Sequence, residues 1–238
     1  MRILVTNDDG IKAPGLEILA TWAKKLGEVT VFAPKEEQSA KSHSINIRTP
    51  FEVKKISILD GIDCYSVESA PADCVRFAVN GMNMDFDIVF SGINRGYNVA
   101  DDIAYSGTVA AISEAAHLGL KGVAFSTVPI SFSWASDSLD RVWKHIIDND
   151  YLAINGLWNV NIPEDPKDIL LTRQGRAYFR DVFDEHSQDQ YIARGTSFYE
   201  KSGKLEQDVD AVMNGFISIS PLTIDHTAMD VFRKLRKK

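Results

Sequence analysis

Runs of apolar residues alternate with amphipathic stretches along much of the chain, a pattern that is typical of α/β proteins. The runs that predict buried strands cover residues 2–6, 29–33, 87–90 and 123–127, with weaker runs at 51–58 and 64–67. The stretches that predict helices cover residues 14–26, 73–79, 108–118 and 138–149. Because the first strand, the helix that Pro14 opens and the second strand form a β-α-β unit, we expect a parallel sheet.

The pattern weakens after Pro163. Short strands are predicted at 169–172 and 217–220, and a helix at 230–235. Between the two strands, residues 174–212 are polar and aromatic, with turn signals but little periodicity. We therefore predict one doubly wound α/β domain over residues 1–238, in which 174–212 form a protruding C-terminal arm.

Composition narrows the class of protein. The 238 residues are 45% hydrophobic and 25% charged, as in ordinary globular proteins. A net charge of −7 disfavours a broad footprint on a nucleic-acid duplex. Cys64 and Cys74 lack the spacing of a zinc site or a disulfide framework, which favours a reducing compartment. Because no apolar run approaches the roughly 18 residues of a membrane span, we expect a cytoplasmic protein without a membrane partner.

Polar turns follow the predicted strands, where open α/β sheets bind their ligands. Asp8 and Asp9 come directly after the first strand, a long loop over 35–46 follows the second, and Asn94 follows the strand at 87–90. Adjacent carboxylates repel one another, and a divalent cation bound between them offsets the unfavourable energy of that repulsion. Carboxylate, amide and hydroxyl oxygens suit Mg²⁺ or Mn²⁺. The alternative is that the two aspartates only form a turn and cap the next helix.

Two further stretches indicate a phosphate site. Ser106, Gly107 and Thr108 open a predicted helix, whose free backbone N–H groups attract anions. In the glycine-rich stretch 92–98, Asn94 offers an oxygen to a metal and Asn98 offers an N–H to a phosphate oxygen. The alternatives are an ordinary helix cap and a Gly/Asn turn.

Several strings, in order along the chain, carry a family resemblance: NDDG, SGINRGYN, YSGTVAA, NVNIP, TRQG and PLTIDHT. Together they resemble the SurE (survival protein E) nucleotidase family. The resemblance implies a Rossmann-like fold and a metal-dependent phosphomonoesterase that hydrolyses nucleoside 5′- and 3′-monophosphates. It implies one divalent cation on Asp8, Asp9, Ser39 and Asn94, with phosphate held by Ser106, Gly107 and Thr108. It also implies a homodimer or homotetramer, because the arm is exchanged between subunits.

One position departs from the family pattern, which has a glycine after the metal-binding serine. Here Ala40 follows Ser39, and this changes the expected geometry of the loop. Asp8 or Asp9 is the candidate to orient the attacking water, and His43 is a candidate acid for the leaving group. Rival hypotheses are a broad-specificity acid phosphatase or exopolyphosphatase, and a non-catalytic nucleotide-binding module. The module is disfavoured because the chain has neither a dinucleotide-binding glycine motif nor a P-loop.

Overall fold

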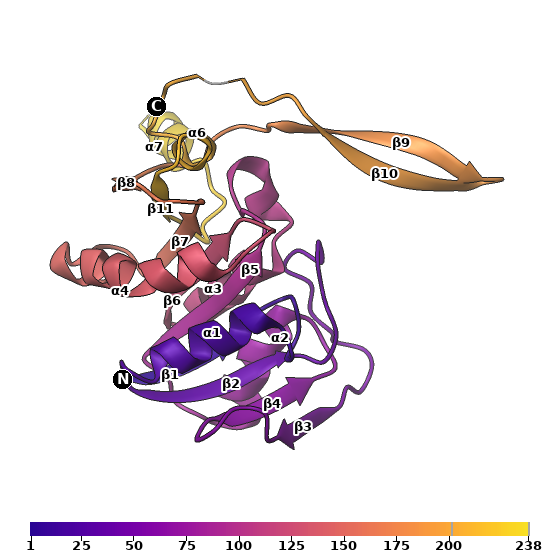
Figure 1. The fold of residues 1–238 in the computed structure, drawn as a ribbon, viewed down its shortest axis with the longest axis vertical. Coiled ribbons are helices and arrows are strands. Elements are labelled where there is room, and N and C mark those ends of the chain that lie inside the picture. Colours follow the sequence, from indigo (N-terminus) through magenta and orange to yellow (C-terminus); the bar gives the residue numbers. More distant parts are fainter. Residues whose placement is uncertain (201, 238) are drawn as a thin grey trace.

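The computed structural model describes residues 1–200 and 202–237. The strands of its central sheet are β1 (Arg2–Thr6), β2 (Glu28–Pro34), β3 (Val53–Ile56), β4 (Asp63–Val67), β5 (Ile88–Arg95), β6 (Lys121–Thr127), β7 (Leu157–Ile162), β8 (Ile169–Leu171) and β11 (Ile217–Pro221). Their order across the sheet is β3-β4-β2-β1-β5-β6-β7-β11-β8 (Figure 1). All neighbours are parallel except β3 with β4 and β7 with β11.

Helices lie on both faces of this sheet, which confirms the predicted doubly wound α/β fold. They are α1 (Pro14–Ala23), α2 (Pro71–Arg76), α3 (Gly107–His117), α4 (Ser133–Asp148), α5 (Tyr151–Ile154), α6 (Asp208–Met213) and α7 (Met229–Arg236), with a π-helical turn at Phe77–Gly81 and a 3₁₀ turn at Ala100–Ala104. Among the described residues, no helix is of a length and apolarity that would let it cross a lipid bilayer.

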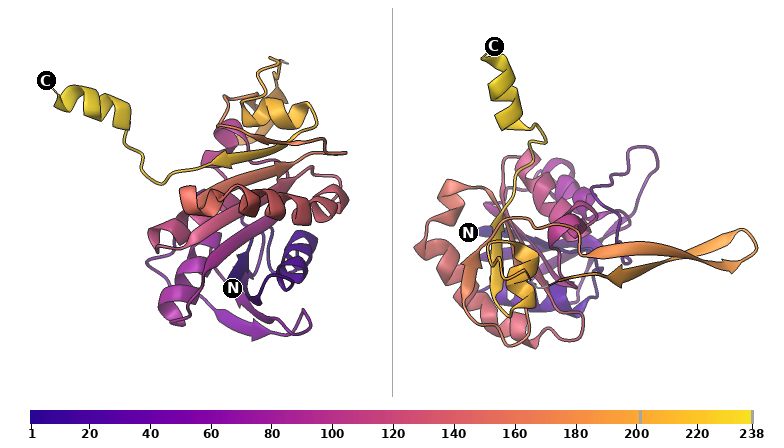
Figure 2. Two further views of the ribbon diagram at one scale, coloured as in Figure 1. Left: turned by 90° about the vertical axis from the view of Figure 1, so that its left-hand side faces the viewer. Right: turned by 90° about the horizontal axis from the view of Figure 1, so that it is seen from above.

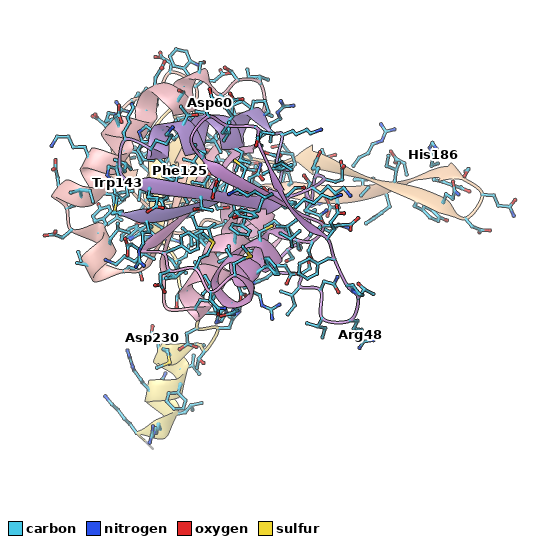
Figure 3. The ribbon with its side chains drawn as sticks, turned by 90° about the horizontal axis from the view of Figure 1, so that it is seen from below. Arg48, Asp60, Phe125, Trp143, His186 and Asp230 are labelled. Atoms are coloured by element: carbon cyan, nitrogen blue, oxygen red, sulfur yellow. The ribbon has the colours of Figure 1, made fainter. Side chains whose placement is uncertain are left out.

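Each face of the sheet has its own apolar core. Under α1 and α4, the ring of Phe90 lies 5.7 Å from Trp22, 5.7 Å from Phe125 and 5.4 Å from Trp143. Figure 3 shows Phe125 and Trp143 within the body of the protein. The opposite face is covered by α2 and α3. Because the central strands are buried on both sides, their sequences are continuous apolar runs, and this is why they were predictable.

Strand β7 was missed, because polar residues alternate within it. Asn159 and Asn161 are fully buried on the face that α3 covers, while Trp158 and Val160 enter the core under α4. The asparagine side chains bond to the backbone of Asn98. A buried strand with one polar face therefore looks like a surface segment in the sequence.

The predicted arm contains a two-stranded hairpin, β9 (Phe179–Ser187) and β10 (Gln190–Ser197). It extends away from the body in Figure 2, and Figure 3 places His186 near its tip. Helix α6, in the same segment, packs on the body, because Val209 and Val212 form an apolar cluster with Val99 and Tyr178. Helix α7 also extends from the body and buries none of its residues (Figure 2).

Candidate active site

Asp8 lies in the turn between β1 and α1 and faces the start of α3. Its side chain is buried, and the hydroxyl of Thr108 donates a hydrogen bond to its carboxylate. Burial raises the pKa of Asp8, while the Thr108 hydroxyl and the backbone N–H groups of Thr108 and Gly107 oppose that rise. Gly107 is required here, because a Cβ at this position would lie 2.8 Å from the Cβ of Asp8. The first predicted acid therefore lies at the tip of the helix predicted to bind anions.

Asp9 is half-buried beside Asp8. Burial and the neighbouring charge of Asp8 raise the pKa of Asp9 to about 6, and the nearby Glu37 adds to the effect. Its carboxylate accepts a hydrogen bond of 3.3 Å from the backbone N–H of Arg95. Two carboxylates thus share a partly dehydrated turn, an arrangement that a cation would stabilise.

Ser39 reaches the same edge of the sheet through the loop after β2. The backbone N–H of Gln38 donates to the carbonyl of Asp8 at 2.7 Å. The Ser39 hydroxyl donates to Oε1 of Glu37 at 2.5 Å, and Ser39 and Asp9 line one cavity of about 310 Å³. The backbone therefore joins the loop that carries Ser39 to the turn that carries Asp8 and Asp9. This connection is needed if the three residues are to bind one cation.

Ala40 adopts a backbone conformation that is typical of glycine. Its φ is +57°, in the left-handed region that favours glycine. The loop is tied down beyond it, since the N–H of Ser42 donates to the carbonyl of Tyr105 at 3.0 Å. Nε2 of His43 lies 2.8 Å from Oε2 of Glu114. The loop therefore keeps a glycine-like turn next to Ser39, with strain in the backbone of Ala40.

Asn94 lies near the end of β5, directly before Arg95, whose backbone N–H bonds to Asp9. Its Nδ2 donates to the carbonyl of Gly96 at 2.8 Å, which leaves its oxygen for another partner. Among residues 1–200 and 202–237, no group of three or more His, Cys, Asp or Glu side chains is arranged to hold a metal. A cation at this edge would therefore need the Ser39 and Asn94 oxygens beside the two carboxylates. Such an all-oxygen set fits a hard divalent ion.

The chain is similar to known proteins in both sequence and fold. The family model described as Survival protein SurE matches residues 3–181. The chain belongs to the SurE family. It is 35% identical to a protein of Clostridium botulinum named 5′-nucleotidase SurE, over 100% of this chain and 99% of that protein. It is 36% identical to a protein of Paramagnetospirillum magneticum with the same name, over 99% of this chain and 94% of that protein. The crystal structure of a SurE protein from Aquifex aeolicus is similar, with a TM-score of 0.82 and 31% identity over 100% of this chain and 99% of that one.

Within the SurE motif SGINRGYN, Asn98 is part of the internal framework. Its side chain is buried, and Nδ2 donates to the hydroxyl of Ser126 at 2.9 Å. Its backbone N–H donates to Oδ1 of Asn161 at 2.8 Å, and its carbonyl accepts from Asn159 at 2.7 Å. These bonds hold the segment between β5 and α3 onto the sheet. The phosphate contact of Asn98 stays a prediction, and the alternating asparagines of β7 were the signal for its framework role.

Ser106, from the SurE motif YSGTVAA, caps α3. Its hydroxyl oxygen accepts a hydrogen bond of 3.1 Å from the N–H of Val109. The side chain also lines a second cavity, of about 400 Å³, along the outer face of α3. His43, the candidate acid, lines this second cavity with His117, whereas Asp9 lines the first. The structure therefore brings Asp8, Asp9, Ser39 and the start of α3 together, and places His43 on a neighbouring surface.

Proposed function

We propose that this chain is a metal-dependent phosphomonoesterase that hydrolyses nucleoside 5′- and 3′-monophosphates to nucleoside and phosphate. The observation that carries the proposal is the buried carboxylate of Asp8 at the first N–H groups of α3, with Asp9 as its neighbour. A cation and a helix N-terminus side by side form a site for a phosphate ester. The relatives named 5′-nucleotidase SurE support the nucleotide as substrate.

In this proposal, Asp8, Asp9, Ser39 and Asn94 hold one Mg²⁺ or Mn²⁺. The ion, when bound, polarises a phosphoryl oxygen and lowers the pKa of a water molecule. Residues of the protein perform the remaining steps. Ser106 fixes the first turn of α3, and the N–H groups of Gly107 and Thr108, which also act on the Asp8 carboxylate, bind the phosphate oxygens as charge develops on them. Asp8 or Asp9 orients the attacking water, and the Thr108 hydroxyl keeps the Asp8 carboxylate in place.

The test is phosphate release from AMP with added Mn²⁺. Asp9→Asn keeps the size of the side chain and removes its charge, so we expect turnover to fall by about 100-fold. Asp101→Asn is the matched control, because Asp101 is an exposed carboxylate in the 3₁₀ turn before α3. Undiminished turnover by Asp9→Asn, or an equal loss in Asp101→Asn, would refute the site.

A substrate panel separates this function from that of a broad-specificity phosphatase or exopolyphosphatase. The panel contains 5′- and 3′-monophosphates, a sugar phosphate and short polyphosphate, with the free nucleoside measured as a product. We expect metal-dependent release of nucleoside to be the fastest reaction. Faster hydrolysis of polyphosphate or of the sugar phosphate would favour the rival function, and metal-dependent binding of AMP without hydrolysis would favour a binding module.

We also propose that the chain forms a homodimer or homotetramer through its C-terminal arm. The hairpin of the arm exposes large apolar side chains, among them Phe183 at 67% and Tyr191 at 66%. Such side chains on a projecting element are typical of subunit contacts. The double variant Phe183→Ser/Tyr191→Ser should lower the mass measured by light scattering, whereas an unchanged mass excludes the hairpin as the contact.

We place the protein in the reducing cytoplasm, and its two free, buried cysteines support this placement.

A further inference from the structure

The cavity beside Asp9 is larger than a phosphate group needs. Its volume is about 310 Å³, within the range of small-molecule sites, which is about 300–1,000 Å³. Asp9 and Ser39 line it together with Arg95 and Phe132. The leaving group of a phosphate ester bound beside Asp9 would therefore have Arg95 and Phe132 within reach in the same cavity.

Arg95 and Phe132 present two planar groups to this cavity. Arg95 directly follows Asn94, and its guanidinium carbon lies 5.8 Å from the centre of the Phe132 ring. Phe132 immediately precedes α4 and is half-buried. Its ring packs against α1 at Gly15, where an added Cβ would lie 2.9 Å from Cε1 of Phe132. The ring therefore packs against α1 at a residue without a side chain. Aromatic rings and guanidinium groups such as these stack on nucleobases.

The charge of the cavity favours a neutral leaving group. Glu37 lines it near Asp9, and its carboxylate accepts the hydrogen bond from Ser39. A second phosphate placed there would meet the negative charge of Glu37, with Arg95 as the cationic side chain of the lining. A nucleoside carries no charge and offers an aromatic base. The cavity therefore fits a nucleoside better than the chain of a polyphosphate.

The cavity along the outer face of α3 is the competing location for the base. Its volume is about 400 Å³, and the rings of His43 and His117 lie 5.8 Å apart in it. It shares Ser106 with the proposed site but contains neither Asp9 nor Ser39. A base bound there would contact neither Asp9 nor Ser39. The position of Asp9 and Ser39 favours the cavity of Phe132.

We propose that Phe132 and Arg95 form the subsite that holds the nucleobase of the substrate, and that stacking there makes purine nucleotides better substrates than pyrimidine nucleotides. This inference rests on the proposed nucleotidase function. The larger ring system of a purine covers more of the Phe132 and Arg95 surface, so the preference follows from area. Phe132 acts as a specificity-determining residue for the leaving group and takes no part in the chemistry at phosphorus.

The experiment compares AMP with glycerol 2-phosphate, which has no base. Phe132→Leu keeps apolar packing against Gly15 but removes the aromatic face. We expect its KM for AMP to rise about tenfold, with kcat within about twofold and glycerol 2-phosphate hydrolysis unchanged. Inhibition by adenosine should weaken by the same factor, and Phe132→Tyr should restore both values. Trp134→Ala is the matched control, since Trp134 is an exposed aromatic residue on α4 that does not line the cavity.

Two results overturn the subsite. The first is AMP hydrolysis by Phe132→Leu with an unchanged KM and an unchanged inhibition constant for adenosine. The second is a rise in the KM for AMP in His117→Ala and not in Phe132→Leu, which would place the base along α3. Failure of the proposed function is a different result, because the unmodified protein would then hydrolyse glycerol 2-phosphate as well as AMP, or neither of them.

Discussion

Replacing Ala40 by glycine should stabilise the protein, although it removes a methyl group. Ala40 has a φ of +57°, and an L-residue in this left-handed region costs about 1–2 kcal/mol. Glycine relieves that strain but raises the entropy of the unfolded chain, at a cost of about 0.4–1 kcal/mol. Ala40 is exposed, so no packing is lost. The expected gain in unfolding free energy is about 0.5–1 kcal/mol, which corresponds to about 1–4 °C in Tm.

Gly119→Ala supplies the opposite change as a control. Gly119 has a φ of +77°, and an added Cβ would meet no atom within 4 Å. Its substitution therefore introduces backbone strain without a clash, and we expect a loss of about 0.5–1 kcal/mol. Urea denaturation of both variants, with and without Mn²⁺, measures the two changes on one scale.

The reasoning is refuted if Ala40→Gly is no more stable than the unmodified protein while Gly119→Ala loses stability. That outcome would mean that Ala40 does not occupy the left-handed region in solution. The loop that carries Ser39 would then differ from the one described, and Ser39 would lose its place in the ligand set. A gain in stability with undiminished affinity for Mn²⁺ would support both the turn and the ligand role.

Three other predictions concern the site and its framework. The pKa of Asp9 is raised to about 6 in the folded chain, so Asp9 should make the metal-free protein lose stability as pH rises from about 4 through about 6, by about 1–3 kcal/mol. Asp9→Asn should reduce this loss in denaturation curves recorded with a chelator, and the part that remains reflects Asp8, whose pKa is also raised. Gly107→Ala places a Cβ 2.8 Å from the Cβ of Asp8, so AMP hydrolysis should fall by about 10-fold or more. Gly156→Ala is the control and should leave AMP hydrolysis unchanged, because its new Cβ would meet no atom within 4 Å. The carboxylate of Asp208 accepts hydrogen bonds from the N–H groups of Ala100 and Gly175 at 3.0 and 2.8 Å, and so joins two loops. Asp208→Ala leaves both N–H groups without this acceptor, so the unfolding free energy should fall by about 2–4 kcal/mol. A loss below about 0.5 kcal/mol would contradict this structural role of Asp208.

The amino-acid sequence by itself determined the class of fold and pointed to the candidate site residues. Apolar runs at β1, β2, β5 and β6 were readable because these strands are buried on both faces, so no polar position interrupts them. Asp8 and Asp9 were readable as candidate ligands because they lie in the turn after β1, and the carboxyl end of a parallel strand is where such sheets bind their ligands.

The tertiary structure alone decided how these parts meet. Thr108 lies 100 residues from Asp8, and only the order β1-β5-β6 with α3 packed above it brings the hydroxyl to the carboxylate. Ala40 keeps a glycine-like φ because the loop is held on both sides, which a local propensity for alanine does not predict. Phe132 reaches the cavity of Asp9 from a segment whose sequence carries no ligand signal. Local patterns encode elements and donor atoms, whereas register, helix packing and loop closure are non-local, and they set the distances on which the site depends.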